Sequence, residues 1–250
     1  VDRSGAAPAI RFGIGTRNDF LLSHYHLEYD DVPDYGVPYF QGRPLDVPVN
    51  VFYGLPEVNS QRDRADISTA AWTHRFDADS DLKSVFRLGG YKRDLWAVAP
   101  RLAGNPATVT DTSVVSRQRQ ARGGVEESLT SQTDYNGKFH FGGMKHQVLL
   151  GMELVREDAD RWSYAQPAGV ANPATTVGNP DPYPLLASNY FTQVSRTGQV
   201  SYIADTVAFY GQETLELTPH WKLVVGARHD RFRADYQRAA PQGPLARTDR

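Results

Sequence analysis

The sequence predicts an all-β fold and, within that class, a fragment of an antiparallel transmembrane β-barrel. Segments that alternate apolar and polar residues are joined in pairs by turns of about four residues, and polar stretches of roughly 25 to 40 residues separate the pairs. Short turns on one side and long loops on the other are typical of outer-membrane barrels, whose turns face the periplasm and whose loops face the outside.

The short connections predict four hairpins, because they are built from Gly, Asn, Asp, Ser or Pro, which supply the backbone angles of tight turns. These turns are Arg17-Asn18-Asp19, Asp77-Ala78-Asp79-Ser80-Asp81, Gly142-Gly143-Met144-Lys145 and Leu217-Thr218-Pro219-His220. The long connections hold most of the prolines and are expected to be extracellular loops. They run from Asp31 to Arg62, from Val98 to Arg122 and from Asp160 to Thr197.

About eight strands are expected, beginning with a short one at Ile10 to Thr16. The clearest alternation lies in Gln132 to Phe141, where one face is apolar and the other almost wholly polar. Its hairpin partner continues the apolar face with His146, Val148, Leu150, Met152 and Leu154, and a later strand does so with Trp221, Leu223, Val225 and Ala227.

Strand length distinguishes a barrel from a soluble β-sandwich, in which the same alternation would bury the apolar face. Leu82 to Val98 and Gln199 to Leu217 exceed the five or six residues usual in globular sheets, whereas a tilted membrane strand needs about 9 to 11. Aromatic residues also lie beside the short turns, where an interfacial belt would place them. They are Phe20, Phe76, Phe141 and Trp221.

Two features fit the alternation poorly. Asp63 to Phe76 mixes apolar residues on both faces, and Glu213 falls on the nominally outward face of its strand. His24 and His26 share one face, and we expect them to line the lumen rather than to bind a metal, because two imidazoles alone are an incomplete set of ligands. The acidic run Glu153, Glu157, Asp158 and Asp160 is interpreted as a solvated barrel rim, and Gly13-Ile14-Gly15 as a strand end, because it lacks the third glycine of a dinucleotide motif.

Composition excludes other classes. The 250 residues are 40% hydrophobic and 11% aromatic, with net charge -2 and mean hydropathy -0.51, and no apolar run approaches the length of a membrane helix. A barrel hides its apolar residues at every second position, so the low mean hydropathy is compatible with a membrane strand. The absence of cysteine leaves the redox compartment open, and the scattered basic residues argue against a nucleic-acid partner.

The chain begins in a turn-like Asp2-Arg3-Ser4-Gly5 stretch, ends inside a polar stretch and shows no signal peptide. We therefore expect residues 1–250 to be one partial β-barrel domain of a longer protein.

Several strings along the chain resemble the motifs of a known family. The string Asp30-Asp31-Val32-Pro33-Asp34-Tyr35-Gly36-Val37-Pro38 is similar to the DD-x-PDYG-x-P string in the first long loop of the barrel of TonB-dependent siderophore receptors. Near the other end, two more strings resemble family patterns. The first is Tyr210-Gly211-Gln212-Glu213 through Leu217-Thr218 to Trp221, which resembles Y-x-Q-D-x-x-x-L-T-x-x-W with Glu213 in place of the commoner Asp. The second is Gly226-Ala227-Arg228-His229-Asp230-Arg231-Phe232, which resembles G-x-R-x-D-x-F. Intervening matches include Phe52-Tyr53-Gly54, Thr73-His74-Arg75-Phe76, Ala99-Pro100-Arg101 and Gly151-Met152-Glu153.

The resemblance implies that the parent has a 22-stranded barrel of the outer membrane. It would import a ferric siderophore, most closely of the catecholate type, by active transport. Energy would come from TonB, ExbB and ExbD through a TonB box and a plug domain that are missing from this piece. The resemblance implies no catalysis and no covalent cofactor or metal centre of the protein itself, since the ferric siderophore is the transported ligand.

Ferric catecholates are flat, anionic and aromatic, so a receptor needs stacking rings and guanidinium groups in its outer loops. The candidate ligand-binding residues are Tyr35, Tyr39, Phe40, Arg43, Trp96, Arg101, Arg161, Trp162 and Tyr164. The alternative for any one of them is packing within its own loop or in the membrane belt. At the level of function, the alternatives are a passive porin, a non-transporting surface-binding barrel, or a soluble all-β binding or carbohydrate-active module, for which no paired carboxylates are visible.

Overall fold

The computed structural model describes residues 2–104, 106–165, 169–188, 190, 195–238 and 246–249. Its described elements are all strands. They are β1 (Asp2–Ala6), β2 (Ala9–Phe12), β3 (Asn18–Asp31), β4 (Tyr39–Phe40), β5 (Arg43–Pro44), β6 (Ser60–Arg75), β7 (Ser80–Leu102), β8 (Val114–Phe141), β9 (Met144–Tyr164), β10 (Thr175–Thr176), β11 (Arg196–Thr218), β12 (Trp221–Arg238) and β13 (Ala246–Asp249).

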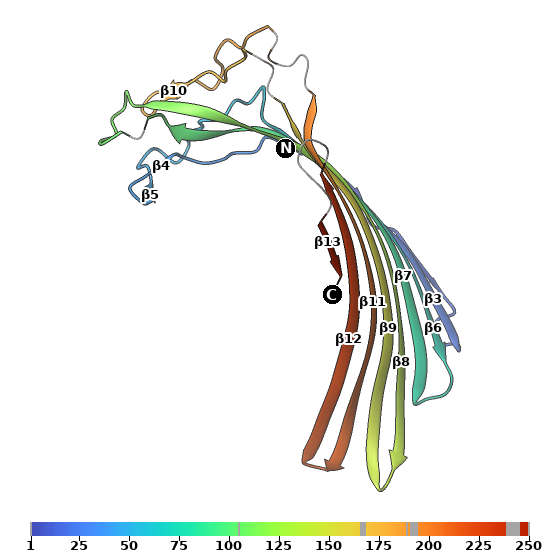
Figure 1. Cartoon of the computed structure of the whole chain (residues 1–250). Helices are drawn as coiled ribbons and strands as arrows, with labels where there is room; N and C mark the ends of the chain where they lie inside the picture. The colour runs from blue at the N-terminus through green and yellow to red at the C-terminus, as the bar shows by residue number, and fades with distance from the viewer. Residues whose placement is uncertain are drawn as a thin grey trace.

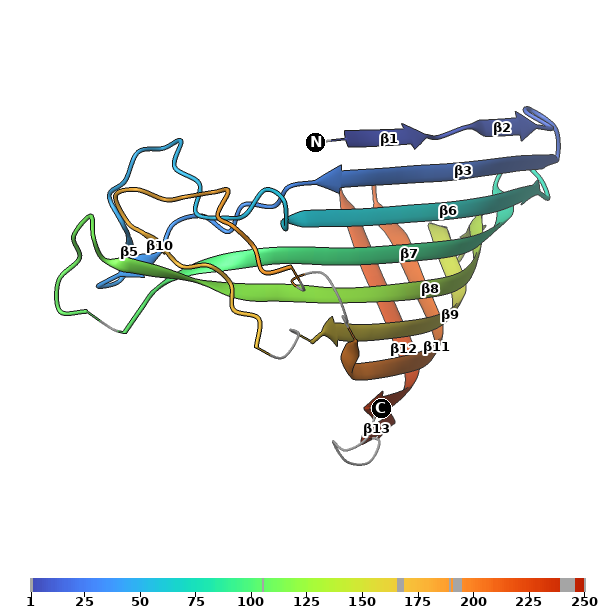
Figure 2. The ribbon, with the colours of Figure 1, turned by 90° about the horizontal axis from the view of Figure 1, so that it is seen from above.

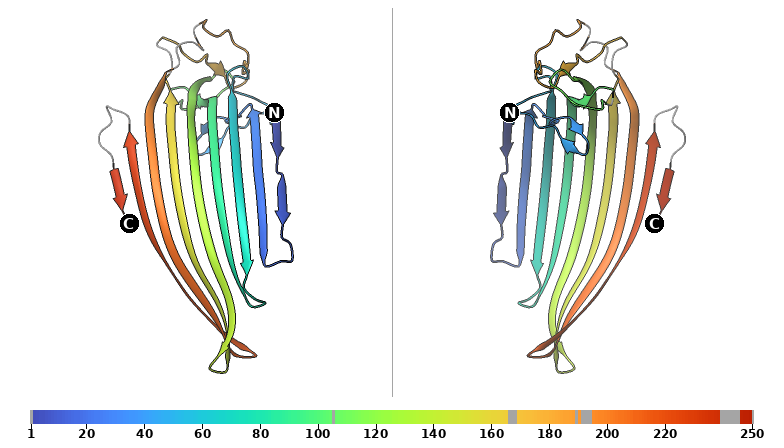
Figure 3. Two further views of the ribbon diagram at one scale, coloured as in Figure 1. Left: turned by 90° about the vertical axis from the view of Figure 1, so that its right-hand side faces the viewer. Right: turned by 90° about the vertical axis from the view of Figure 1, so that its left-hand side faces the viewer.

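Most of these strands form one curved antiparallel sheet, in which β1, β3, β6, β7, β8, β9, β11, β12 and β13 lie side by side in chain order, and this confirms the predicted fold class (Figures 1 and 3). At the loop end β10 pairs with β8, and β4 and β5 form a separate two-stranded sheet. Both β1 and β2 pair with β3, so they act as one interrupted strand, and with β3, β6, β7, β8, β9, β11 and β12 they make up the expected eight. The short β13 adds to β12. The sheet is open, so its two edges do not meet as they would in a complete barrel.

All four predicted hairpins are present, but the first turn lies earlier in the chain than predicted. Asn18 and Asp19 already belong to β3, and β2 ends at Phe12 instead of Thr16. Gly13 and Gly15 have φ angles of 76° and 79°, a region that glycine adopts without steric cost. The Gly13-Ile14-Gly15 segment is therefore the turn itself and not a strand end.

The strands extend further into the predicted loops than the sequence indicates. The 23-residue β7 continues to Leu102, and the 28-residue β8 already starts at Val114. The second long loop is therefore reduced to residues 103–113. The loops between β3 and β6, between β7 and β8 and between β9 and β11 gather at the same end of the sheet, opposite the short turns (Figure 2).

Strand register separates the two faces of the sheet. One row runs from Phe20 through Trp72, Ser84, Thr133 and Met152 to Phe209. Within the sheet, most of the exposed large apolar side chains share this face, among them Ile10, Phe12, Phe20, Leu22, Phe86, Leu88, Phe139, Phe141, Leu150, Leu154, Val207, Phe209, Leu223 and Val225. A band of exposed apolar residues over several neighbouring strands is the surface that faces lipid in an outer-membrane barrel. We call this face the outward face and the opposite face the luminal face.

The luminal face is held together by polar side chains. Tyr210 donates to Asp134 two strands away, and Gln132 Nε2 donates to Tyr210 Oη at 2.9 Å. Gly151 lies between them in the register, and a side chain there would meet the Tyr210 ring, since a Cβ would lie 2.1 Å from it. Nearby, Arg228 bridges Glu153 and Asp230. Such a polar face suits a water-filled or plugged lumen.

Register corrects the prediction for His24 and His26. Both lie on the outward face, in the rows just beyond Leu22, and do not line the lumen. The luminal side of β3 carries Leu21, Tyr25, Leu27 and Tyr29 instead. In the poorly patterned β6, Ala70 and Trp72 face outward, and Ile67, Thr69 and Ala71 face the lumen. The predicted outward position of Glu213 on β11 is confirmed.

Buried apolar residues gather at the loop end of the sheet. One cluster joins Val98 of β7 to Leu55, Val58, Val170 and Tyr190 from two loops. A second cluster joins Val115 of β8 to Tyr53 and Val177 from the same two loops. The described residues include no helix with the length and hydropathy that crossing a membrane would require.

Candidate ligand-binding site

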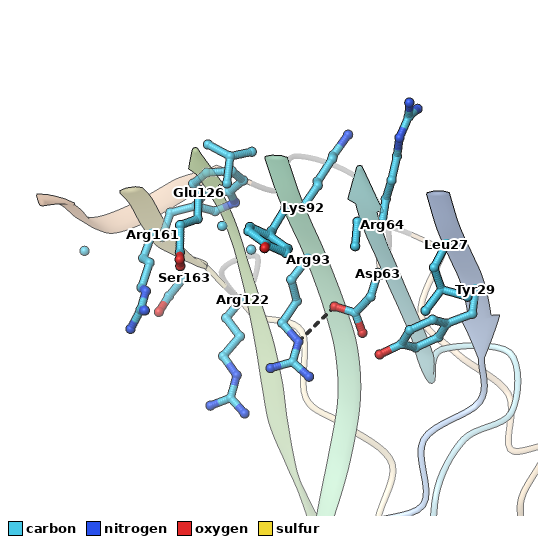
Figure 4. A pocket seen from close by; sticks show the side chains of 17 residues that line it. Leu27, Tyr29, Asp63, Arg64, Lys92, Arg93, Arg122, Glu126, Arg161 and Ser163 are labelled. Carbon is cyan, nitrogen blue, oxygen red and sulfur yellow. Dashed lines mark ion pairs between the residues drawn. The ribbon is translucent and has the colours of Figure 1, made fainter. Parts of the chain in front are cut away.

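A hollow of about 680 Å³ lies near the extracellular ends of β3, β6, β7, β8 and β9 (Figure 4). Glycines form part of its floor, because Gly123, Gly124 and Gly198 line it without side chains. Its polar lining includes Tyr29, Asp63, Tyr91, Arg93, Arg122, Glu126, Arg161 and Ser163. The hollow therefore combines a bare backbone surface with rings and charged groups.

Three arginines of this hollow share the luminal face of neighbouring strands. Arg93 pairs with Gly124, and Gly124 pairs with Arg161, so the two guanidinium groups belong to one row with no side chain between them. At the usual strand spacing their Cα atoms are about 10 Å apart. Arg122 lies two residues above Gly124 on the same face. Figure 4 shows Arg93 and Arg122 on the side of Asp63 and Tyr29, whereas Arg64 and Lys92 point to the opposite side.

The charge of this row is only partly neutralised. Arg93 Nε lies 3.1 Å from Asp63 Oδ1. Arg122 and Arg161 make no ion pair among the described residues, although Glu126 also lines the hollow. Free guanidinium groups beside tyrosine rings can bind a flat anionic ligand by charge, by forked hydrogen bonds and by stacking.

The structure brings Arg161 and Trp162 to the lining of this hollow, and it packs the rings of Trp96, Trp162 and Tyr164 against one another. Trp96 stacks on Tyr164 at a ring distance of 4.6 Å, and Trp162 meets Tyr164 edge-on at 6.5 Å. Trp162 is buried and carries the Arg196 guanidinium 3.9 Å from its ring centroid. The rings of these three predicted residues are thus occupied by one another and by cations.

The remaining predicted residues lie elsewhere in the loop end. Tyr35 and Tyr39 are exposed, Phe40 and Arg43 pair in the small β4–β5 hairpin, and Arg101 donates to the Pro100 carbonyl. None of these five lines the luminal hollow. Arg93 and Arg122 were not predicted, because ligand contacts were expected mainly in the loops. The alternation of β7 and β8, followed from their hairpin turns, places both residues on the luminal face.

Arg117 fastens two loops to the extracellular end of β8. Its Nε donates to the Tyr53 carbonyl at 2.7 Å, its Nη1 to the Pro173 carbonyl at 3.2 Å, and its Nη2 to the Asp181 carbonyl. Burial lowers the pKa of the Arg117 guanidinium, since desolvation disfavours its charged form. Burial likewise raises the pKa of Tyr53, whose hydroxyl donates to the Val177 carbonyl at 2.7 Å. These bonds form an extracellular cap over the sheet end.

The histidines do not form a metal site in the described part of the chain. His26 Nδ1 lies 2.7 Å from Asp66 Oδ1, and His24 Nδ1 lies 3.0 Å from Ser68 Oγ. No group of three His, Asp or Glu side chains in the described ranges is placed to hold a metal ion. The acidic run on β9 is divided between the faces, because Glu153 and Glu157 point to the lumen and Asp158 and Asp160 point outward.

The curved sheet, the outward apolar band and the polar luminal face define a piece of an outer-membrane β-barrel of the receptor type. Residues 10–250 match the family model described as TonB dependent receptor-like, beta-barrel. The chain belongs to this TonB-dependent receptor family, and its place is the bacterial outer membrane.

Curated relatives support this assignment over nearly the whole chain. The chain is 26% identical to the probable TonB-dependent siderophore receptor PiuA of Acinetobacter baumannii, with 98% of the chain and 35% of PiuA covered. It is also 26% identical to the catecholate siderophore receptor Fiu of Escherichia coli K12, with 98% of the chain and 34% of Fiu covered. The chain thus spans about a third of the length of the relatives it matches.

Solved structures share the fold. The crystal structure of PiuA from Acinetobacter baumannii superposes with a TM-score of 0.83 at 23% identity, covering 99% of this chain and 38% of that one. The open form of the ferric-catecholate import receptor Fiu from E. coli K12 superposes with a TM-score of 0.82 at 22% identity, covering 99% and 42%. The open sheet is therefore the same arc of strands that those barrels contain.

Proposed function

We propose that the complete protein is an outer-membrane receptor that imports a ferric siderophore by TonB-coupled active transport. The observation that carries the proposal is the presence of two luminal guanidinium groups, Arg122 and Arg161, that make no ion pair with a described residue, in a chain of the TonB-dependent receptor family. A ferric tris-catecholate complex is anionic and presents aromatic rings, so this hollow matches its charge and shape. The names of PiuA and Fiu support the same class of cargo.

In this proposal the loop residues act before the hollow does. Tyr35, Tyr39, Phe40, Arg43 and Arg101 lie in the loops or at the strand tips, where an incoming ligand arrives first. Arg161 then receives the ligand at the luminal face, while Trp96, Trp162 and Tyr164 hold the surrounding strands in place. The protein carries out no reaction on its cargo, and TonB with ExbB and ExbD supplies the energy through a plug domain in the rest of the parent chain.

The test is uptake of radioactive iron by iron-limited cells. A strain lacking the gene should lose uptake of one ferric catecholate, and the full-length gene should restore it. Normal uptake of every siderophore in the deletion strain would overturn the proposal.

A porin and a receptor are separated by a second strain that lacks TonB. The receptor should fail to import there although it still binds the ligand at the cell surface. Uptake that continues without TonB would instead identify a passive channel.

A further inference from the structure

A second cavity, of about 300 Å³, lies at the extracellular end of β8 and β9. Its lining residues are Arg119, Gln120, Ala121, Arg122, Ser163 and Tyr164. These residues carry two guanidinium groups, an amide and two hydroxyl groups, and none of them carries a carboxylate. A cavity with cations and hydrogen-bond donors but no acidic side chain is complementary to an oxyanion.

Arg119 is the unusual member of this lining. Its Nε, Nη1 and Nη2 atoms are shielded from solvent, and no described residue accepts a hydrogen bond from them. The guanidinium carbon lies 5.6 Å from the centroid of the Trp96 ring and 4.8 Å from that of Tyr190. Two aromatic rings offset part of the desolvation of a cation, but they satisfy none of its five N–H donors.

We propose that this cavity binds a carboxylate or phosphate group and that Arg119 is the residue that holds it. The oxyanion would accept forked hydrogen bonds from Arg119, which turns from the two rings toward the cavity, while Ser163 and Gln120 offer further donors. Because Arg119 and Arg122 are three residues apart on β8, they leave the strand on opposite faces, so Arg119 is not part of the luminal row. Arg122 and Ser163 line both cavities, which therefore adjoin each other.

Binding of an anion by Arg119 in this cavity does not require that the protein transports a siderophore. Its test therefore uses simple anions. Full-length receptor in detergent is titrated calorimetrically with sodium phosphate and, separately, with sodium acetate, at an ionic strength held constant with sodium chloride. Saturable binding of either anion is expected, and the responding anion identifies the group that the cavity takes.

Arg119→Met removes the charge while keeping much of the side-chain length, and it should weaken the binding by about tenfold or more. Arg119→Lys keeps the charge but loses the forked donor, so an intermediate loss is expected. The matched control is Arg156→Met on β9, because Arg156 faces outward and pairs with Asp205. That variant should bind as the wild type does.

Tryptophan fluorescence shows whether Arg119 moves when the anion binds. Movement of the Arg119 guanidinium away from Trp96 should change the emission, and Trp96→Phe should remove that change while leaving the calorimetric signal. No saturable heat with either anion, or equal affinity in Arg119→Met, would overturn the inference. If Arg119→Met fails to assemble in the membrane, Arg119→Lys decides, since unchanged affinity in that variant also overturns it. Either failure would leave siderophore uptake by the same cells unaffected, which keeps the two proposals separate.

Discussion

His146 Nδ1 lies 2.6 Å from Glu213 Oε1 on the outward face of the sheet. The other ring nitrogen, Nε2, lies 3.1 Å from the Phe141 carbonyl oxygen, which can only accept, so Nε2 carries a proton. The ring of Phe139 stacks on the imidazole at 5.0 Å. The glutamate that breaks the apolar pattern of β11 is therefore provided with a polar partner beneath an aromatic ring.

Replacing His146 alone should destabilise the barrel. His146→Leu leaves the Glu213 side chain facing lipid without its partner, at an expected cost of about 1 to 3 kcal/mol. The midpoint of heat-induced unfolding, read from the gel mobility of the full-length receptor, should fall. The double variant His146→Leu/Glu213→Leu should regain most of the loss, because an apolar pair suits the band. Equal midpoints for the single and double variants would contradict this account.

Removing the Arg117 side chain should loosen the extracellular cap. Arg117→Met leaves the carbonyls of Tyr53, Pro173 and Asp181 without their donor, and each lost bond to a charged group is worth about 1.5 to 3 kcal/mol. Limited proteolysis of the full-length receptor should then cut within residues 48–59 and 170–183 at a higher rate. Exposed Arg3 on β1 offers a control, since Arg3→Met should leave the cleavage rate of both segments unchanged.

The luminal arginines should determine affinity for anionic ligands. Arg122→Gln and Arg161→Gln should each weaken binding of a ferric catecholate by about tenfold, as expected for a lost charged hydrogen bond. Binding of a neutral ferric hydroxamate should change little, and the difference should shrink as salt rises. The control is Arg156→Gln on the opposite face of β9. Equal losses for the charged and neutral complexes would show that the arginines act on the structure of the hollow instead.

Two strand glycines provide a matched pair. A Cβ on Gly123 would lie 2.6 Å from the Trp162 ring, whereas a Cβ on Gly90 would have its nearest neighbour at 4.0 Å. Gly123→Ala should therefore displace Trp162, shift its fluorescence and cost about 1 to 3 kcal/mol. Gly90→Ala should do neither. Similar spectra for the two variants would mean that Trp162 does not need the bare backbone at Gly123.

The sequence predicted the elements better than the faces. Outward positions in the second half of the chain, such as Trp221 and Leu223, are confirmed because most polar residues of their strand lie on the other face. On β3 both faces carry leucine, so periodicity could not assign His24, and only the register through β6, β7 and β8 connects it to the outward face.

The site was predicted less completely. Of the predicted residues, Arg161 and Trp162 line the hollow. Arg122 ends the stretch Val98 to Arg122, whose prolines and polar residues predicted a loop, and Arg93 lies inside the predicted strand Leu82 to Val98, in which only Trp96 was expected to contact the ligand. Contacts such as that of Trp96 with Tyr164 join distant strands, and a single sequence holds no record of them.

The length of β8 has a practical consequence. Its 28 residues correspond to about 90 Å of strand, or about 70 Å of height at a tilt of about 40°, against about 45 Å for a bilayer with its headgroups. The β7–β8 connection therefore stands well clear of the cell surface, and Thr112 is exposed within it. Because this stretch contains no cysteine, the substitution Thr112→Cys would introduce a thiol that a membrane-impermeant dye can label on living cells.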